Sequence, residues 1–339
     1  MTDTTTVVPG NRQMLIASLP NDALTTSNYE LVTTPTPEPS EGEVLCRTVA
    51  FTIGAGQRAG LQGSASYAGA PVAGRVMGGT GVAEVVASRH ASLAVGDLVR
   101  ADTGWQDFSV HRGDRVTKVD ASLDAAHHLG VLGTNGLTAY FGLTDIGRPQ
   151  PGDTVMVSAA AGSVGHLVGQ MAKVLGARVV GVVGSDEKAR MLVEELGFDA
   201  ALNRRSPDFR TVLKDATPDR IDVYFDNTGG AILESALFRM DTHGRIVCCG
   251  AASQYDTSNP QGGPRGVPGL LVNNRVRMEG FLVFDYTDRF EEARRQITEW
   301  ITTGRLAPRV TEYEGLAAAP QAFIDLLAGD TVGTTIVRV

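Results

Sequence analysis

The sequence predicts an α/β protein in which a doubly wound parallel sheet accompanies a second, mainly-β domain of barrel-like character. Short β-type segments separated by glycine- and proline-rich turns fill the chain from residue 43 to residue 119. From Asp153 onward, β-type segments alternate with helical ones, as is typical of a parallel sheet covered on both faces. A glycine-rich turn joins the first of these strands to the first of these helices.

Length and composition narrow the class of protein. A chain of 339 residues is long enough for two domains, and its net charge of -8 argues against nucleic acid and anionic membranes as partners. Cys46, Cys248 and Cys249 match neither a disulfide framework nor a zinc pattern. The N-terminus lacks the features of a signal peptide, and glycines interrupt the uncharged run 154–172. We therefore expect a cytoplasmic protein with reduced thiols.

The first part of the chain reads as strands and loops. Residues 1–40 are polar and end in a proline-rich run that cannot be helical, whereas Glu43–Ile53 is rich in β-branched residues. Residues 54–82 hold many glycines and few helix formers, so a loop is expected there. Further short strands are expected at Val82–Val86, Leu98–Arg100, Phe108–Val110 and Val116–Val119.

The second part begins near Ala125, where the composition changes, and the apolar run Leu129–Leu143 is compatible with helix. The expected strands are Thr154–Ser158, Arg178–Val183, Ile221–Asp226, Arg245–Cys249 and Met278–Val283. The expected helices are Gly165–Gly176, Asp186–Leu196, Phe209–Lys214, Ala231–Phe238 and Arg289–Thr303. The tail Thr335–Val339 again resembles a strand and is expected to return to the N-terminal domain.

The turn after the first of these strands carries Gly162, Gly165 and Gly169. This spacing suits a tight turn, a close ligand approach and the packing of a helix against a strand. A helix that begins at such a turn offers free N–H groups and the positive end of its dipole to a phosphate. The context favours a dinucleotide site over the alternative of a purely structural turn.

The end of the next strand indicates which dinucleotide. NAD sites carry an acidic residue there, but this chain has Gly184 and Ser185, with Lys188 one helical turn later and Arg204 further on. Space, a hydroxyl donor and positive charge suit a 2′-phosphate, so NADP(H) is favoured. The alternative is that Ser185 serves only as a helix N-cap, and the two roles are compatible.

Two later loops follow strands of the same sheet, at 225–230 and 249–255, and both are expected to border the cofactor. Asn227 is a candidate to bind ribose or amide, and equally a candidate helix cap. Tyr255 is placed where a phenol reaches the cofactor or a substrate oxygen. Cys248 and Cys249 are interpreted as core thiols and not as nucleophiles.

Several runs together resemble one family. They are LGVLGTNGLTAYFGL (129–143), SAAAGSVGHLVGQMAK (158–173), VVGSDEKARMLVEELGFDAALN (182–203), IDVYFDNTGG (221–230), CGAASQY (249–255) and EGFLVFDY (279–286). The chain thereby resembles the medium-chain dehydrogenase/reductase superfamily, in its zinc-independent leukotriene/prostaglandin reductase-like branch of NADP-dependent alkenal and enone reductases. The similarity runs from about Asn11 to the C-terminus.

The resemblance implies two domains and a homodimer. The first is a GroES-like domain at 1–130, completed by 310–339, and the second is a Rossmann domain at 131–309. No metal site is implied, and the subunits are expected to join through the edge strand near Met278–Val283. Tyr255 and Tyr67 match the family's substrate-contacting phenols and are the candidate catalytic residues. The candidate cofactor-binding residues are Gly162, Ser163, Val164, Gly165, Ser185, Lys188, Arg204, Asn227, Cys249, Gly250, Ala251, Ser253, Tyr255, Phe281, Leu282 and Val283.

The chain departs from the family pattern at several positions. The family's Asp-Pro-Tyr-Met-Arg loop is Gly54–Arg58 here, which predicts a smaller, more flexible loop and a wider pocket. Thr134 and Asn135 replace Met-Pro, and Arg204 replaces a tyrosine. Thr331 and Thr334 stand where the family has the asparagine and lysine of a cofactor contact. These changes leave the substrate less defined than the cofactor.

The expected reaction is transfer of hydride from NADPH to the β-carbon of an α,β-unsaturated aldehyde or ketone. Negative charge then develops on the carbonyl oxygen, where Tyr255 and the nicotinamide ribose hydroxyl are the expected donors. The alternatives are a quinone oxidoreductase and a tailoring reductase for one pathway intermediate. A non-enzymatic NADPH-binding protein is also retained, because the loop tyrosine and the late asparagine and lysine are missing.

Overall fold

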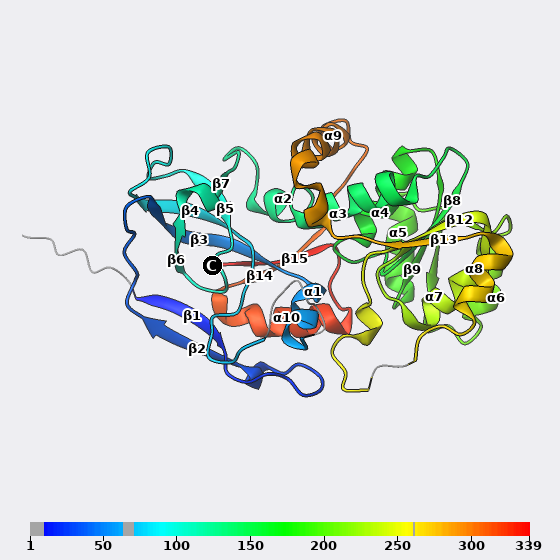
Figure 1. Ribbon diagram of the computed structural model, residues 1–339, viewed down its shortest axis with the longest axis horizontal. Helices are drawn as coiled ribbons and strands as arrows, with labels where there is room; N and C mark the ends of the chain where they lie inside the picture. Colours follow the sequence, from blue (N-terminus) through cyan, green and yellow to red (C-terminus); the bar gives the residue numbers. More distant parts are fainter. Residues whose placement is uncertain (1–9, 64–70, 260–261) are drawn as a thin grey trace, which may run out of the picture. The chain divides into compact units, whose positions relative to one another are not determined.

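The computed structural model describes residues 10–63, 71–259 and 262–339 (Figure 1). The chain divides into two compact units. The first unit comprises Met1–Leu129, Glu312–Ala328 and Thr335–Val339, and the second comprises Gly130–Thr311 and Gly329–Thr334. In the described part of the chain, no helix is long and apolar enough to cross a membrane.

The first unit is mainly β. A seven-stranded sheet has the order β14-β15-β3-β4-β5-β7, with β6 also paired to β3, and β1 and β2 form a separate antiparallel pair. Trp105 is fully buried in the hydrophobic core of this unit and stacks on Phe51 and Tyr29. The strands are β1 (Asn11–Ile16), β2 (Tyr29–Thr34), β3 (Glu43–Ile53), β4 (Gly81–Ser88), β5 (Leu98–Ala101), β6 (Phe108–Arg112), β7 (Thr117–Lys118), β14 (Val310–Glu314) and β15 (Thr334–Arg338).

A helix, α1 (Ala55–Leu61), occupies the stretch for which a flexible loop was expected, so that expectation is wrong. The side-chain oxygen of Gln57 accepts a hydrogen bond from the Gly54 N–H at 2.7 Å, which satisfies a donor at the helix N-terminus. Arg58 and Leu61 are buried. Capping and burial thus outweigh the low helix propensity of the glycines. Two other helices in this unit are α2 (Ala125–Leu129) and α10 (Ala319–Ala328).

The second unit contains a six-stranded parallel sheet of order β10-β9-β8-β11-β12-β13. The chain builds outward from β8 in one direction and then from β11 in the other, so the order reverses between these two strands. Ligands of open α/β sheets bind at such a reversal, beyond the carboxyl ends of the strands. The strands are β8 (Thr154–Ser158), β9 (Arg178–Val183), β10 (Ala200–Asn203), β11 (Ile221–Asp226), β12 (Met240–Cys248) and β13 (Arg277–Gly280).

The helices of this unit agree with most of the expected ones, with shifts of one or two residues at several ends. Strand β10 and helix α8 were not expected, and β13 ends at Gly280 instead of Val283. The fold class, a Rossmann sheet beside a mainly-β unit, is confirmed. The helices are α3 (Thr134–Phe141), α4 (Gly165–Val174), α5 (Asp186–Leu196), α6 (Phe209–Ala216), α7 (Gly230–Leu237), α8 (Val267–Asn274) and α9 (Phe290–Thr302).

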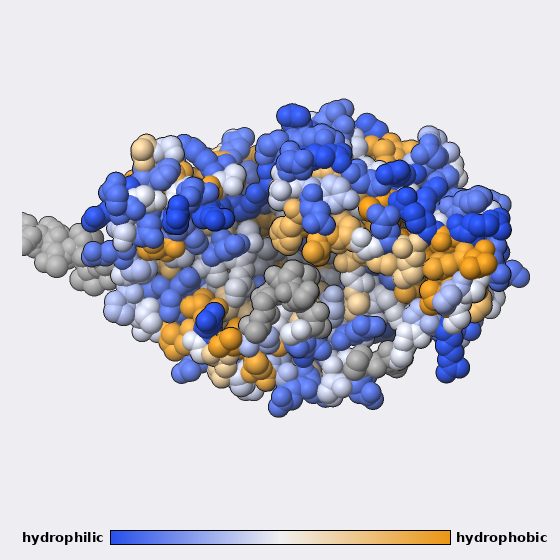
Figure 2. Space-filling view, viewed as in Figure 1, coloured by the Kyte–Doolittle hydropathy of each residue, from blue (hydrophilic) through white to orange (hydrophobic). Residues whose placement is uncertain are grey.

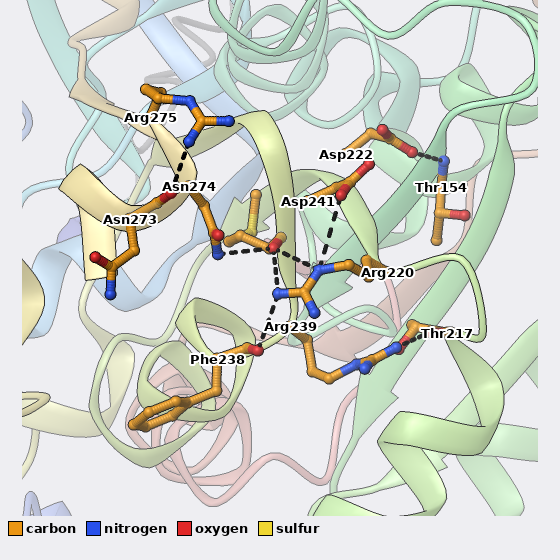
Figure 3. A network of polar contacts seen from close by, with 11 residues as sticks. Thr154, Thr217, Arg220, Asp222, Phe238, Arg239, Asp241, Asn273, Asn274 and Arg275 are labelled. Atoms are coloured by element: carbon orange, nitrogen blue, oxygen red, sulfur yellow. Dashed lines mark hydrogen bonds and ion pairs between the residues drawn. The ribbon is translucent and has the colours of Figure 1, made fainter. Parts of the chain in front are cut away.

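A polar network ties the amino ends of the strands together (Figure 3). Arg220 Nη2 donates to the carbonyl oxygen of Met240 at 2.7 Å, and Asn274 Nδ2 donates to the same oxygen at 3.2 Å. The carboxylate of Asp222 accepts the N–H of Thr154 at 2.8 Å. These contacts lie at the end of the sheet opposite to the one where a dinucleotide is expected.

Candidate functional site: a dinucleotide crevice

Glycines are required in the β8–α4 turn and in the first part of α4, because side chains there would collide with neighbouring groups. A Cβ at Gly165 would lie 2.3 Å from the carbonyl oxygen of Ala159, within the turn itself. A Cβ at Gly169 would lie 1.9 Å from the ring of Phe198, so this glycine lets α4 pack closely. At Gly162 the nearest atom would be 3.2 Å away, so that position is tight but less restricted. Two of the three glycines therefore serve packing.

The turn also presents free donors. Among the described residues, the backbone N–H groups of Val164 and Gly165 have no acceptor, whereas the N–H of His166 already bonds to Gly162 and that of Ser163 faces Gly333 in the parallel bridge between Gly162 and Gly333. The two free groups stand at the N-terminus of α4, where the helix dipole is positive. The turn therefore offers the arrangement that binds a pyrophosphate.

A return segment, Gly329–Thr334, packs against this turn. The N–H of Gly333 donates to the carbonyl oxygen of Ala161 at 2.8 Å, and the hydroxyl of Ser163 donates to the carbonyl oxygen of Gly333 at 3.1 Å. The Ser163 hydroxyl is thus committed within the protein, and its backbone N–H faces the same segment in the parallel bridge between Gly162 and Gly333. Asn135 Nδ2 donates to the hydroxyl oxygen of Thr334 at 3.3 Å, which pairs two positions where the chain departs from its family's pattern.

His166 anchors the turn from inside. It is fully buried, its Nδ1 donates to the carbonyl oxygen of Gly162 at 2.7 Å, and its Nε2 accepts the N–H of Arg309 at 3.1 Å. Burial lowers the pKa of His166 to about 4, so the imidazole is neutral at pH 7. No motif in the sequence marks this histidine.

The carboxyl end of β9 carries the residues expected to select the dinucleotide. Ser185 is the N-cap of α5, and its Oγ accepts the N–H of Lys188 at 3.3 Å. A Cβ at Gly184 would lie 3.9 Å from Arg204 Nε, which places this guanidinium beside the strand end. Asp186 accepts a hydrogen bond from Asn203. A hydroxyl and two cationic side chains therefore gather here, and no acidic residue ends the strand.

Lys188 has a second set of partners. Its Nζ donates to the carbonyl oxygens of Gly329 and Thr331, the latter at 2.7 Å. Burial lowers the pKa of Lys188, while the charges of Asp330 and Glu187 act in the opposite direction. Lys188 therefore fastens the return segment to α5 through the backbone carbonyls of Gly329 and Thr331.

Next to Arg204 lies a cavity of about 340 Å³. Its walls include the ring of Phe209 and the side chains of Pro207 and Ile232, together with Ser235. The lining also includes the polar residues Arg204, Asp208, Arg210 and Thr211. A cavity that combines apolar walls with a few polar groups has the character of a site for a flat aromatic base.

The loops after β11 and β12 lie together, as expected. Asn227 Nδ2 donates to the carbonyl oxygen of Ser158 at 2.8 Å, which binds the first loop to the end of β8. The N–H groups of Cys249 and Gly250 both donate to the carbonyl oxygen of Asp226, at 2.9 and 3.1 Å. The two loops and the β8 turn therefore form one surface at the carboxyl ends of three adjacent strands.

Tyr255 lies in the second loop. Its hydroxyl oxygen accepts the N–H of Ala251 at 3.3 Å, which leaves the phenolic proton available to another acceptor. Ser253 Oγ donates to the carbonyl oxygen of Thr228 at 2.6 Å and so joins the two loops. Burial raises the pKa of Cys248 to about 11 and that of Cys249 to about 12, so both thiols are protonated at neutral pH.

The segment Phe281–Val283 follows β13. The ring of Phe281 packs where Gly142 has no side chain, and Val283 is buried, whereas Leu282 is exposed. Tyr67 lies outside the described residues, and Gly54–Arg58 belongs to the first unit.

Three residues at this surface were not predicted from sequence: Asp226, Ser158 and Gly333. A signal existed for the first two, because both end strands that were correctly placed. No comparable signal marks Gly333. In the described part of the chain, no group of three or more His, Cys, Asp or Glu side chains is arranged to hold a metal ion.

Comparison with known proteins is consistent with this site. Residues 12–119 match the family model described as the N-terminal domain of oxidoreductase, and residues 163–299 match the one described as zinc-binding dehydrogenase. Among the described residues, no cluster of His, Cys, Asp or Glu side chains offers the ligands for the zinc ion that the second description names.

Similar proteins cover almost the whole chain. The NADPH-dependent curcumin reductase of Escherichia coli is 39% identical and is matched over 97% of both chains. A 2-alkenal reductase (NADP(+)-dependent) of Nicotiana tabacum is 39% identical over 81% of this chain and 80% of its own. The crystal structure of CurA in complex with NADPH from Vibrio vulnificus is 38% identical, with a TM-score of 0.92 over 97% of this chain and 99% of that chain. This chain therefore belongs to the medium-chain dehydrogenase/reductase superfamily, in its leukotriene/prostaglandin reductase-like branch of NADP-dependent oxidoreductases.

Proposed function

We propose that this protein is an NADPH-dependent reductase of the carbon–carbon double bond in α,β-unsaturated aldehydes and ketones. The observation that supports this proposal is the surface at the carboxyl ends of β8, β9, β11 and β12, with free N–H groups at the α4 N-terminus and cations at the end of β9. The names of the curcumin and 2-alkenal reductases support the substrate class.

Different residues bind different parts of NADPH. The N–H groups of Val164 and Gly165 receive the pyrophosphate, and the cavity beside Arg204 receives the adenine. Ser185, Lys188 and Arg204 surround the 2′-phosphate, with Lys188 exchanging a carbonyl partner for it. The side-chain nitrogen of Asn227 bonds to Ser158, so its side-chain oxygen remains to face the nicotinamide.

The chemistry requires charge stabilisation on the substrate. Bound NADPH supplies the hydride, which adds to the β-carbon while the electrons of the double bond move toward the carbonyl oxygen. Tyr255 donates its phenolic hydrogen bond to that oxygen, and a proton from solvent then completes the α-carbon. The product is the saturated carbonyl compound. The hydride and the proton supply both added hydrogen atoms, so the reaction balances without a metal ion.

The test follows NADPH absorbance with alkenals, acyclic and cyclic enones, quinones and saturated aldehydes, and identifies the product by mass. We expect one equivalent of NADPH to be consumed per saturated carbonyl formed from alkenals or enones, with saturated aldehydes inert. Turnover of quinones alone would instead support a quinone oxidoreductase. Tight NADPH binding without turnover of any compound would indicate a non-catalytic protein.

The proposal also includes a homodimer and a cytoplasmic location. Strand β13 is the last in its sheet, and Val272, Phe284 and Leu282 nearby are 73%, 57% and 41% exposed. Hydrophobic surface gathers around α8 (Figure 2), which supports a homodimer through this edge. Light scattering should give twice the 35.7 kDa chain mass, and Val272→Asp should halve it while Val193→Asp should not. A cytoplasmic location is supported by three free cysteines.

A further inference from the structure

Asp226 lies at the carboxyl end of β11 and is only 2% exposed. Its Oδ1 accepts hydrogen bonds from Tyr224 Oη at 2.7 Å, Gly229 N at 2.8 Å, Thr228 N at 3.0 Å and Ser158 Oγ at 3.2 Å. Among the described residues, no lysine, arginine or histidine forms an ion pair with this carboxylate. Neutral donors thus supply all of the hydrogen bonds that offset its burial.

The backbone of Asp226 holds the neighbouring loop. Its carbonyl oxygen accepts the N–H groups of Cys249 and Gly250, at the point where β12 ends. The N–H of Ala252 donates to the carbonyl oxygen of Asn227 at 3.1 Å. One residue therefore bonds to both loops that border the crevice, through its carboxylate on one side and its carbonyl group on the other.

Ser158 extends this arrangement to β8. Its Oγ donates to the Asp226 carboxylate and accepts the N–H of Asn227 at 2.9 Å, while its carbonyl oxygen accepts the Asn227 side chain. Ser158 is fully buried and immediately precedes the glycine-rich turn. The ends of β8, β11 and β12 are thus joined through Asp226, whose carboxylate bonds to Ser158 and whose backbone carbonyl bonds to Cys249 and Gly250.

We propose that Asp226 is a positioning residue for NADPH, acting through Ser158 and Asn227 to hold the 227–230 and 249–255 loops in the conformation that receives the cofactor. Loops that are ordered before binding lose less conformational entropy when the ligand arrives. The effect on cofactor affinity is independent of the substrate, whereas the effect on hydride transfer rests on the proposed function.

A carboxylate suits this role better than an amide. Its oxygen carries more negative charge and is the stronger acceptor, and it offers no N–H group that would itself need a partner. Asp226→Asn keeps the shape and an acceptor, whereas Asp226→Ala removes the acceptor and leaves five donors without it, counting the Thr228 hydroxyl at 3.4 Å. The two variants should therefore give a graded response.

The chain offers a matched control on the same strand. Asp222 lies at the amino end of β11, is partly buried, and accepts the backbone N–H of Thr154 (Figure 3). Asp222→Ala removes a carboxylate from the same strand without touching the crevice. It separates loss of cofactor positioning from general loss of stability.

The experiment measures the dissociation constant of NADPH by fluorescence titration, with thermal midpoints measured in parallel. We expect Asp226→Ala to weaken binding about tenfold or more and Asp226→Asn about threefold, with Asp222→Ala within twofold of the wild type. All three substitutions are expected to lower the thermal midpoint. An Asp226→Ala affinity within twofold of wild type, or an equal loss in Asp222→Ala, would overturn the proposal.

Two milder variants keep the test decisive if the Asp226 variants do not fold. Ser158→Ala removes the hydroxyl that bonds to the Asp226 carboxylate and to the Asn227 N–H, while its backbone carbonyl still accepts the Asn227 side chain. Tyr224→Phe removes one donor to Asp226. Ser158→Ala should weaken NADPH binding more than Tyr224→Phe, and the reverse order would contradict the role of Asn227. With an enone that the wild type reduces, KM for NADPH should rise more than kcat falls. Binding without any reduction by the wild type would refute the proposed function but leave the affinity test intact.

Discussion

The ammonium group of Lys188 donates a hydrogen bond to the carbonyl oxygen of Thr331 at 2.7 Å and so joins α5 to the return segment Gly329–Thr334. The same lysine follows Ser185, the N-cap at the end of β9. A structural bond and the proposed 2′-phosphate site therefore share one positive charge. Because the carbonyl is neutral and the phosphate is not, the charged ligand is the stronger partner when it is present.

Removing this charge should alter cofactor choice. Lys188→Ala is expected to raise KM for NADPH by about 10-fold to 100-fold, since a hydrogen bond between charged groups is worth roughly 1.5–3 kcal/mol. KM for NADH should change little, because NADH has no 2′-phosphate. Steady-state kinetics with both cofactors checks this.

Two companion variants complete that measurement. Lys188→Arg keeps the positive charge and should retain most of the preference for NADPH. Lys214→Ala removes a lysine from the last turn of α6 and should leave both constants unchanged. A parallel rise in KM for NADH would show that Lys188 acts only by holding the return segment in place.

His166 predicts a dependence of stability on pH. Its pKa is about 4 in the folded protein and about 6.5 in the unfolded chain. Between these values the unfolded chain binds a proton that the folded protein excludes. The free energy of unfolding should therefore fall as pH drops from 6.5 to 4, by up to about 3 kcal/mol from this residue. Urea unfolding at a series of pH values measures the slope.

A substitution isolates the contribution of this histidine. His166→Gln keeps a donor and an acceptor but does not titrate, so it should flatten the slope below pH 6.5. The exposed His243 on β12 provides the control, and His243→Gln should leave the slope unchanged. Equal slopes in wild type and His166→Gln would show that other groups cause the acid sensitivity.

Helix α4 should not tolerate a methyl group at Gly169. The added Cβ would meet the Phe198 ring at 1.9 Å, so Gly169→Ala is expected to cost about 1–3 kcal/mol of unfolding free energy. Combining it with Phe198→Leu should recover part of this loss. Gly269→Ala on α8 is the control, because nothing lies within 4 Å of that Cβ, and it should be neutral or stabilising. Thermal unfolding compares the four proteins.

The sequence could predict what depends on local pattern. Strand β8 and helix α4 follow from an apolar run and a glycine spacing, and α5 follows from Ser185 with two acidic residues in its first turn. Helix α1 was missed because its stability depends on burial and on the Gln57 contact to Gly54, neither of which composition reveals.

Contacts between residues far apart in the chain are harder to predict from the sequence. Asp226 acquires its role only when Ser158, 68 residues earlier, and Cys249 arrive at the same edge of the sheet. Likewise, the contact of Gly333 with Ser163 spans 170 residues. Each of these residues is ordinary in its own segment, and its function arises from strand order and register, which a single sequence does not specify.

Tyr255 provides the sharpest test of the proposed chemistry. Loss of the hydroxyl removes the donor to the developing oxyanion and one 3.3 Å bond from the Ala251 N–H. The bonds of Ser253 to Thr228 and of Cys249 and Gly250 to Asp226 remain and should keep the loop in place. Tyr255→Phe should lower kcat/KM for an accepted enone by about 100-fold, with the affinity for NADPH within twofold. Tyr313→Phe in the first unit removes a hydroxyl bonded to Asp325 and should lower stability without this kinetic loss. An unchanged kcat/KM in Tyr255→Phe would remove Tyr255 as the oxyanion donor and assign that role to a group outside this loop.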